Sequence, residues 1–331
     1  MLGFDIPLPA KRHMNVFIMD PIDASAVKLL SEVHTVVDYP ASRQQDWHTN
    51  ADAVVVRTFE VRAADVQKAR KLKLVAKHGT GVDNIDVGAA ADAGVIVTNT
   101  PGANAAAVAE YALAITLALA RKVTIADKAV RQPILPRLSA GMELGGKTVG
   151  VLGFGDIGRR TARLFKAAFN TDLLVYDPFV PDAALEEPGA ARAGSVHELL
   201  ARCDVVTLHL PLSAETRNLI GAAEFALMRD TALLINVARG GIVNEADLYR
   251  ALVDGRIAGA ASDVFEIEPV QATHPLFELQ NFVASPHIAA SSKESLVRMG
   301  AAAAEAVLDV LAGRAPAHRV LPQPEFLNTS T

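Results

Sequence analysis

The sequence predicts an α/β protein built from two doubly wound parallel-sheet domains. Short, wholly apolar runs alternate with stretches of helical pattern along most of the 331 residues. The alternation stops at one long alanine-rich run, residues 105–120, and then starts again. Buried strands with helical spacers are typical of βαβ units, which form parallel sheets. Half of the residues are hydrophobic, so the chain can supply two cores.

The first series of apolar runs predicts a domain that ends near residue 100. A helix is expected to start near Asp23, and further helices over residues 63–71 and 84–93. The expected strands contain short apolar runs and cover residues 15–20, 53–56, 73–77 and 95–98.

The second series predicts a second domain over residues 101–287. Its expected strands are again apolar and cover residues 147–154, 172–177, 204–210, 232–238, 257–264 and 282–286. A last helix, 292–313, follows them, and its return to the first domain would make the chain cross between domains twice. The end segments, 1–13 and 319–331, are expected to be tails.

Composition excludes several classes of protein. The formal net charge of −5, without a basic stripe, argues against a nucleic-acid partner. A single cysteine, Cys203, leaves no disulfide framework and no thiolate zinc site, and we expect no metal site. The apolar run 105–120 carries Glu110 and is short for a membrane span, so no membrane partner is expected. No signal-peptide pattern opens the chain, which predicts a cytoplasmic protein.

A glycine motif follows the first strand of the second series. Gly153, Gly155 and Gly158 form G-x-G-x-x-G between this strand and a helix. The first glycine permits a tight turn, the second lets a pyrophosphate approach the backbone, and the third lets helix and strand pack closely. The helix N-terminus offers free N–H groups to the phosphates. The motif predicts a dinucleotide site, the alternative being a glycine-rich turn in an unrelated α/β domain.

An acidic residue, Asp177, ends the next expected strand, about 20 residues further along. A carboxylate at this place accepts hydrogen bonds from the ribose hydroxyls of the adenosine and repels a 2′-phosphate. The motif therefore favours NAD over NADP, unless Asp177 only caps a helix.

Three reactive residues follow three consecutive expected strands: Arg239, Glu268 and His287. Ligands of open parallel sheets bind beyond the carboxyl ends of the strands, so these side chains can converge on one cleft. An arginine binds a carboxylate bidentately, and an imidazolium can protonate a carbonyl oxygen while a nicotinamide delivers hydride. Glu268 would favour the protonated imidazole and fix its orientation.

Each of these residues has a structural alternative. Arg239 could be a surface arginine, and His287 a satisfied histidine near a helix start. Glu268 could be a loop carboxylate, with Glu266 as a competing candidate, and Asp263 could cap a turn.

Six segments of the chain resemble the D-2-hydroxyacid dehydrogenase family, and within it the phosphoglycerate dehydrogenase and hydroxypyruvate reductase group. They are HGTGVDNIDV, NTPGANAAAVAEYAL, GGKTVGVLGFGDIG, NVARGGIVNEADL, ASDVFEIEP and SPHIAASSKES. The resemblance covers roughly residues 50 to 300 and implies a Rossmann domain, 101–287, inserted into a flavodoxin-like substrate domain, 14–100 plus 288–318. It also implies an active site in the cleft between the domains.

The resemblance implies a role for each matching residue. Arg239 would bind the substrate, His287 would be the acid/base, and Glu268 would support it. Further implied cofactor contacts, beside the glycines and Asp177, are Asp156, Ile157, Leu210, Val237, Ala238, Asp263 and Thr80. Implied substrate contacts, beside Arg239, are Arg57 and the loop Gly79, Thr80, Gly81 and Val82.

The chain departs from the family at residues 131–144, where relatives often carry a Gly-Lys-Trp. That region borders the substrate cleft in the family, so the identity of the acid stays open. No regulatory serine-sensing module is expected after the last helix.

The sequence thus predicts an NAD-dependent enzyme that interconverts a small, anionic D-2-hydroxy acid and its 2-keto acid. A 3-phosphoglycerate dehydrogenase is the first expectation. The alternatives are a hydroxypyruvate/glyoxylate reductase and, in another class, an NAD-sensing corepressor that binds peptides. The family further implies a homodimer through the nucleotide-binding domains, with the helix 104–121 as a contact.

Overall fold

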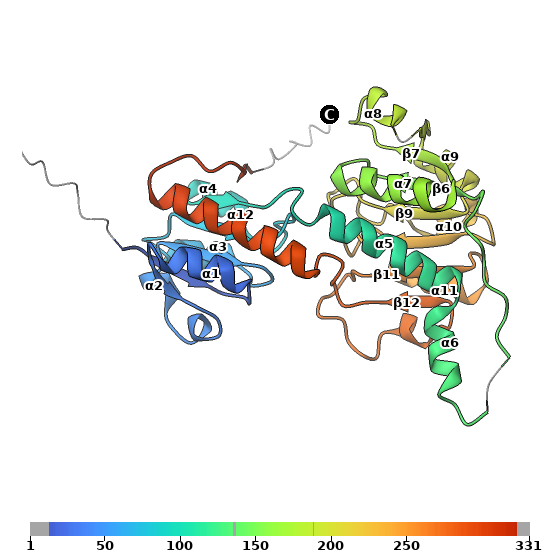
Figure 1. Cartoon of the computed structure of the whole chain (residues 1–331), viewed down its shortest axis with the longest axis horizontal. Helices are drawn as coiled ribbons and strands as arrows, with labels where there is room; N and C mark the ends of the chain where they lie inside the picture. Colours follow the sequence, from blue (N-terminus) through green and yellow to red (C-terminus); the bar gives the residue numbers. More distant parts are fainter. Residues whose placement is uncertain (1–12, 135–136, 188, 323–331) are drawn as a thin grey trace, which may run out of the picture. The chain divides into compact units, whose positions relative to one another are not determined.

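The computed structural model describes residues 13–134, 137–187 and 189–322 (Figure 1). The chain divides into two compact units. Unit 1 comprises the residues up to Asn104 and those from Lys293 onward, and unit 2 comprises Ala105–Ser292. These limits lie a few residues beyond the boundaries expected near 100/101 and 287/288. The core of each unit is formed around one sheet.

The sheet of unit 1 has six strands in the order β13-β5-β4-β3-β1-β2. Neighbours pair in parallel except β13, which runs antiparallel to β5. The strands are β1 (Asn15–Ile18), β2 (Thr35–Val37), β3 (Ala53–Val56), β4 (Leu74–Lys77), β5 (Ile96–Thr98) and β13 (Arg319–Val320). Arg319 and Val320 were expected in a tail, so that expectation was wrong there: two ladder positions on the edge of β5 were available to them. Residues 1–12 and 323–331 lie outside the described chain.

Helices cover both faces of the unit 1 sheet. Val16 and Ile18 of β1 face α1 (Ala24–Ser31) and α12 (Lys293–Leu311), while Phe17 and Met19 point to the other face. The alternation follows from the two-residue period of a strand. The opposite face is covered by the shorter helices α2 (Trp47–Asn50), α3 (Ala63–Lys68) and α4 (Val87–Asp92), and a 3₁₀ turn, η1 (Ala41–Arg43), follows β2.

The sheet of unit 2 has seven parallel strands in the order β12-β11-β10-β9-β6-β7-β8. They are β6 (Thr148–Leu152), β7 (Asp172–Tyr176), β8 (Ala191–Arg192), β9 (Val205–Leu208), β10 (Leu233–Asn236), β11 (Gly259–Ser262) and β12 (Phe282–Ala284). Strand order reverses at β6, because β7 and β8 lie on one side of it and β9 to β12 on the other. Ligands of doubly wound sheets bind beyond the carboxyl end of the strand where the order reverses.

Two helices cover one face of this sheet, and three cover the other. α5 (Ala105–Ala120) and α7 (Asp156–Phe169) pack on each other and on one core, as Figure 1 shows. The opposite core is closed by α9 (Val196–Arg202), α10 (Ala222–Leu227) and α11 (Glu245–Val253). The remaining elements are α6 (Val123–Val130), α8 (Ala183–Glu186) and the 3₁₀ turn η2 (Pro275–Glu278).

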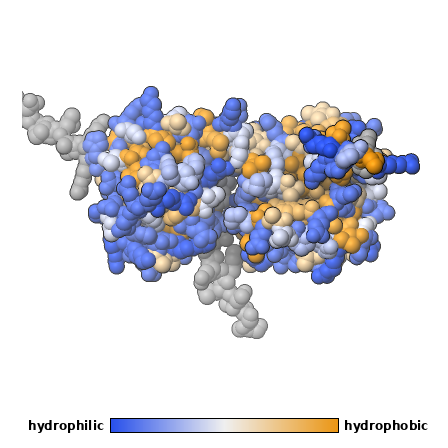
Figure 2. Space-filling view, turned by 90° about the horizontal axis from the view of Figure 1, so that it is seen from below, coloured by the Kyte–Doolittle hydropathy of each residue, from blue (hydrophilic) through white to orange (hydrophobic). Residues whose placement is uncertain are grey.

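The face of the molecule in Figure 2 carries hydrophilic residues interspersed with apolar ones. Within the described parts of the chain, none of the helices combines the length and the apolar character that crossing a membrane requires.

Candidate active site

The turn between β6 and α7 explains why glycines stand at three positions. Gly153 has a φ of 89°, and a Cβ there would lie 2.7 Å from the carbonyl oxygen of His209. At Gly158 a Cβ would lie 2.1 Å from the carbonyl oxygen of Gly153, so the close contact of helix and strand requires glycine. A Cβ at Gly155 would meet no atom within 4 Å. The middle glycine therefore faces open space, which is where a ligand could approach the backbone.

The first turn of α7 provides hydrogen-bond donors toward that space. Gly155 is the N-cap and supplies no side-chain acceptor to the first amides of the helix. Asp156 is exposed in this turn, and Ile157 packs against the core. Uncapped amides and the positive end of a fourteen-residue helix suit a phosphate group. The residues present thus fit the pyrophosphate of a dinucleotide.

Asp177 directly follows β7 and joins this strand end to the glycine turn. Its Oδ2 accepts the N–H of Phe154 at 2.7 Å, and its Oδ1 accepts the N–H of Phe179 at 2.9 Å. A carboxylate has about four acceptor sites, so further donors can still bind it. The carboxylate is therefore fixed beside the turn and keeps the capacity to accept from hydroxyl groups.

Glu268 and His287 form a hydrogen-bonded pair. The Nδ1 atom of His287 lies 2.7 Å from Oε2 of Glu268, and the side chains are 48% and 35% exposed. Because a carboxylate accepts hydrogen bonds, Nδ1 carries the proton of this contact. Nε2 of His287 has no hydrogen bond within the described chain, so it can exchange a proton with a ligand.

The Glu268 carboxylate is held in its ionised form. Burial alone would raise its pKa. The hydrogen bond and charge of His287 outweigh burial, and the Phe265 amide and the Arg239 charge act in the same direction. The pKa of Glu268 therefore lies below its ordinary value. Its second oxygen, Oε1, accepts the Phe265 N–H at 3.0 Å, which fixes the side chain against its own loop.

Arg239 follows β10 in a tight turn, residues 236–239, that Asn236 closes. The Asn236 Oδ1 accepts the N–H of Ala238, and its Nδ2 donates to the carbonyl of Arg239, both at 3.0 Å. Val237 and Ala238 are buried within this turn. Arg239 lies close enough to Glu268 for its charge to lower the carboxyl pKa. The three predicted reactive residues therefore gather at the carboxyl ends of β10, β11 and β12.

Asp263 is fully buried after β11 and binds the segment 285–289 that carries His287, which we call the His287 turn. Its carboxylate accepts from the Ser285 hydroxyl at 2.6 Å and from the amides of Ile288 and Ala289 at 2.9 and 2.8 Å. The backbone of His287 has a φ of 54°, a left-handed conformation that is uncommon for residues other than glycine. Asp263 therefore stabilises an unfavourable turn that orients His287.

Leu210 follows β9, and its side chain lies beside Gly153. All the predicted cofactor contacts except Thr80 belong to unit 2. Among the described residues, no three His, Cys, Asp or Glu side chains lie together as metal ligands would.

Unit 1 gathers the other candidates at its own strand ends. Arg57 follows β3, and the loop from Gly79 to Val82 follows β4. The Nζ atom of Lys77 donates to the Arg57 carbonyl at 2.6 Å, which links the two loops. Thr80 donates its hydroxyl to Oδ1 of Asn104 at 3.2 Å, and its carbonyl accepts from Asn99 at 2.7 Å.

Sequence reasoning missed the residues that hold these loops. Asp20, which follows β1, is buried, and its Oδ2 accepts the amides of Arg57, Thr58 and Phe59 at 2.6, 2.8 and 2.9 Å. Asn236 and Ser285 stood inside motifs but had no expected role. Their signal was weak but present: each is a polar residue next to an apolar run.

Comparisons with known proteins find dehydrogenases that act on 2-hydroxy acids. Residues 113–289 match the family described as D-isomer specific 2-hydroxyacid dehydrogenase, NAD binding domain. The chain is 39% identical over 306 residues to the D-3-phosphoglycerate dehydrogenase of Archaeoglobus fulgidus. The aligned region covers 91% of this chain but only 58% of that protein. It is 38% identical over 324 residues to the glyoxylate reductase of Aeropyrum pernix, and this alignment covers 93% of this chain and 96% of that protein.

A solved structure has the same fold at lower sequence identity. The glyoxylate/hydroxypyruvate reductase of Sinorhizobium meliloti, in complex with NADP and malonate, superposes with a TM-score of 0.82 at 26% identity. The match covers 93% of this chain and 97% of that one.

Proposed function

Because the chain belongs to the D-isomer specific 2-hydroxyacid dehydrogenase family, we propose that it interconverts a small D-2-hydroxy acid and its 2-keto acid with NAD. The observation that carries this proposal is the His287–Glu268 pair, 2.7 Å apart. The pair lies at the carboxyl ends of the strands in the sheet whose β6–α7 turn fits a dinucleotide. Proton transfer and cofactor binding are thereby supported in one unit.

Each residue of the trio has a defined task in this proposal. His287 donates a proton from Nε2 to the carbonyl oxygen in reduction, and Nε2 accepts the hydroxyl proton in oxidation. Glu268 orients the ring through Nδ1 and stabilises the imidazolium. Arg239 binds the substrate carboxylate through its planar guanidinium. A nicotinamide, when bound, supplies or accepts the hydride.

The dinucleotide would be held by the backbone at Gly155 and Ile157 and by the Asp177 carboxylate. Asp177 accepts hydrogen bonds from ribose hydroxyls, and its charge disfavours a 2′-phosphate. We therefore propose NAD rather than NADP. Asp177→Ala should weaken NAD binding more than NADP binding, and an unchanged preference would contradict the ribose role.

For the substrate we propose an anionic acid. Arg57 and the Gly79–Val82 loop of unit 1 are the proposed contacts to its charged groups. The first candidate is 3-phosphoglycerate. Glyoxylate and hydroxypyruvate are the second: the Aeropyrum relative is a glyoxylate reductase, and the Sinorhizobium neighbour is a glyoxylate/hydroxypyruvate reductase.

A panel of 2-keto acids with NADH tests the proposal. We expect turnover of at least one acid, and His287→Ala should abolish it while NADH still binds, as fluorescence titration would show. If NADH binds but none of the acids is turned over, the proposed activity is contradicted. An equal loss of NADH affinity in the variant would mean that His287 is structural.

We propose that the protein is a cytoplasmic homodimer. α5 packs on α7, β10, β11 and β12 of its own unit, whereas α6 and the residues after it expose Val123, Val130 and Ile134, 55%, 70% and 85% accessible. These apolar side chains support α6 as part of the contact. Light scattering should give twice the chain mass, and Val130→Asp with Ile134→Asp should lower it to one chain. The buried free thiol of Cys203 fits a reducing compartment, which cell fractionation would test.

A further inference from the structure

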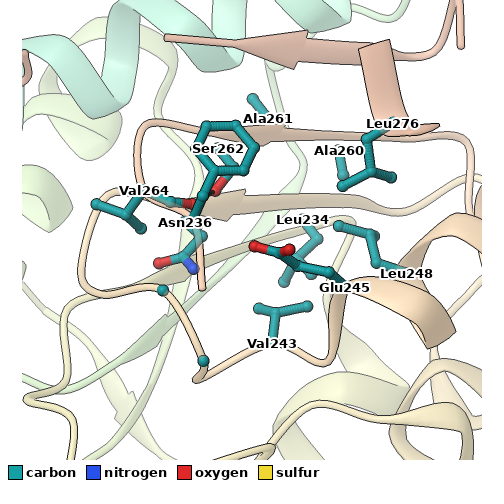
Figure 3. Close-up of a pocket in the computed structure, with 13 residues that line it drawn as sticks. Leu234, Asn236, Val243, Glu245, Leu248, Ala260, Ala261, Ser262, Val264 and Leu276 are labelled. Carbon is teal, nitrogen blue, oxygen red and sulfur yellow. Dashed lines mark hydrogen bonds between the residues drawn. The ribbon is translucent and has the colours of Figure 1, made fainter. Parts of the chain in front are cut away.

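A cavity of about 10 Å³ lies between α11 and the ends of β10 and β11 in unit 2 (Figure 3). Its lining is mostly apolar or glycine. Among the described residues that line it, Glu245 is the one charged side chain, and Figure 3 shows its carboxylate directed inward among them. A carboxylate at such a place requires hydrogen-bond donors, because burying a charge is costly otherwise.

Glu245 finds its donors in one histidine and one backbone amide. Its Oε2 lies 3.0 Å from Nε2 of His274, and both side chains are 19% exposed. Nδ1 of His274 is buried without a partner within the described chain, so the shared proton lies on Nε2. The other carboxylate oxygen, Oε1, accepts the N–H of Glu266 at 2.7 Å.

The amide that Glu245 binds belongs to the Phe265–Glu266 peptide, and the two peptide units that flank Phe265 contact the loops of Arg239 and Glu268. The Phe265–Glu266 peptide packs on Gly240, where a Cβ would lie 1.8 Å from the Phe265 carbonyl oxygen. Gly240 directly follows Arg239. In the preceding peptide unit the Phe265 N–H donates to Oε1 of Glu268 at 3.0 Å, and Oε2 of Glu268 binds His287.

We propose that Glu245, supported by His274, is a positioning residue that fixes the Phe265–Glu266 peptide and thereby sets Glu268 and Arg239 relative to each other. The inference rests on the proposed function for the roles of those two residues. Neither Glu245 nor His274 needs to touch a substrate. Their effect is transmitted through Phe265, whose two flanking peptide units have little freedom, because the backbone of Gly240 lies against one and the Glu268 carboxylate binds the other.

Two variants of Glu245 separate positioning from a general effect on folding. In Glu245→Gln the amide oxygen still accepts the Glu266 N–H, so kcat should stay close to that of the wild type. In Glu245→Ala the peptide is released. A displacement of about 1 Å at a reacting group costs on the order of 100-fold, so we expect kcat to fall about 10- to 100-fold with unchanged NADH affinity.

A carboxyl titration by ¹³C NMR provides a readout that needs neither cofactor nor substrate. The signal of Glu268 is identified by its absence in Glu268→Gln. The Phe265 amide helps to lower the pKa of Glu268. Glu245→Ala should therefore raise that pKa, and Glu245→Gln should restore it. Gly240→Ala, whose methyl group would collide with the Phe265 carbonyl, should raise it as well.

Glu224 provides a matched control in the same unit. It also pairs with a histidine, His197, at 3.2 Å, and it also accepts a backbone amide, that of Gly221, at 3.1 Å. Among the described residues, no hydrogen bond joins it to the Glu268 loop. Glu224→Ala should lower stability without changing kcat or the titration of Glu268.

The outcomes are distinct. If Glu245→Ala loses stability as Glu224→Ala does but keeps both kcat and the pKa of Glu268, the positioning inference is overturned. If the wild type turns over none of the keto acids, the proposed function fails. The Glu268 titration then still decides whether Glu245 sets the position of this carboxylate.

Discussion

In each unit a buried aspartate holds a loop that carries a proposed site residue, and the two cases differ in what the carboxylate must stabilise. Asp20 follows β1 and accepts three successive amides of residues 57–59, the Arg57 loop, which follows the neighbouring strand β3. Asp263 follows β11 and accepts two amides of the His287 turn after the neighbouring strand β12. In both sheets, a carboxylate at one strand end positions the loop at the next.

The difference lies in the conformation that is held. No residue of the Arg57 loop has a positive φ, and Asp20 is further neutralised by Arg43 at 2.8 Å. His287 has a left-handed backbone, and Asp263 forms no ion pair within the described residues. Asp20 therefore anchors an unstrained loop, whereas Asp263 maintains a strained one that carries the proposed proton donor. Loss of Asp263 should alter chemistry, and loss of Asp20 should alter binding.

The largest expected effect is that of Asp263→Asn. Three hydrogen-bond donors point at the Asp263 carboxylate. The asparagine side chain would offer them one acceptor oxygen, and its NH₂ group, itself a donor, cannot accept. The His287 turn should relax from its left-handed conformation, which costs about 1–3 kcal/mol to maintain. We expect kcat to fall on the order of 100- to 1,000-fold, as removal of a general acid does. Steady-state turnover at saturating NADH measures this.

Asp204→Asn is the control for that prediction. Asp204 directly precedes β9, at the amino ends of the strands of the same sheet, and is 9% exposed. Its carboxylate accepts the Thr148 amide at 2.9 Å and also binds Arg229. Its loss should cost about 1–3 kcal/mol of unfolding free energy and leave kcat unchanged. An equal fall of kcat in both variants would attribute the effect to a loosened sheet rather than to the His287 turn.

Asp20→Asn should have a smaller effect on activity and a different one. The Arg57 loop loses the charge that its three amides bind, and Arg43 loses its carboxylate partner. If Arg57 contacts the substrate, KM should rise about tenfold, the cost of one weakened charge-assisted hydrogen bond, with little change in kcat. Initial rates over a range of keto acid concentrations give both constants. A fall in kcat with constant KM would remove the contrast between the two aspartates.

The stability that Asp20 contributes should depend on pH. Burial would raise the pKa of Asp20, but the amides of the Arg57 loop and the Thr58 hydroxyl outweigh it, and the pKa lies below the ordinary value of 3.8. A group with a lowered folded pKa stabilises the fold above its unfolded pKa. The stability difference between the wild type and Asp20→Asn should thus be complete above about pH 4 and shrink as the pH falls through the folded pKa. Urea unfolding at a series of pH values measures it, and a difference that grew on acidification would contradict it.

The two aspartates also show what the sequence could and could not predict. The glycine turn and the trio were predictable, because their residues lie in short motifs at the ends of apolar runs. Asp263 lay in such a motif, but its hold on the His287 turn was not predicted. The role of Asp20 depends on β3 pairing with β1 although β2 lies between them in sequence. No local pattern contains that adjacency.

The same reason accounts for the other omissions. Glu245 and His274 are 29 residues apart in the chain, and only the fold brings them together. The missed strands β2, β8 and β13 have three, two and two residues, too few to show a periodicity. All three are edge strands, where the neighbouring strand rather than their own composition determines that they pair.

The smallest expected effects come from the one hydroxyl that each aspartate accepts. Ser285 donates to Asp263 at 2.6 Å, whereas Thr58 donates to Asp20 at 3.0 Å. Each bond contributes about 1 kcal/mol. Because the Ser285 bond is shorter, Ser285→Ala should cost more unfolding free energy than Thr58→Val. It should also lower kcat a few-fold, on the order of 1 kcal/mol, through the His287 turn, while Thr58→Val leaves kcat unchanged. Equal effects on kcat would show that Asp263 and Asp20 affect turnover alike, and would contradict the distinction between an anchored and a strained loop.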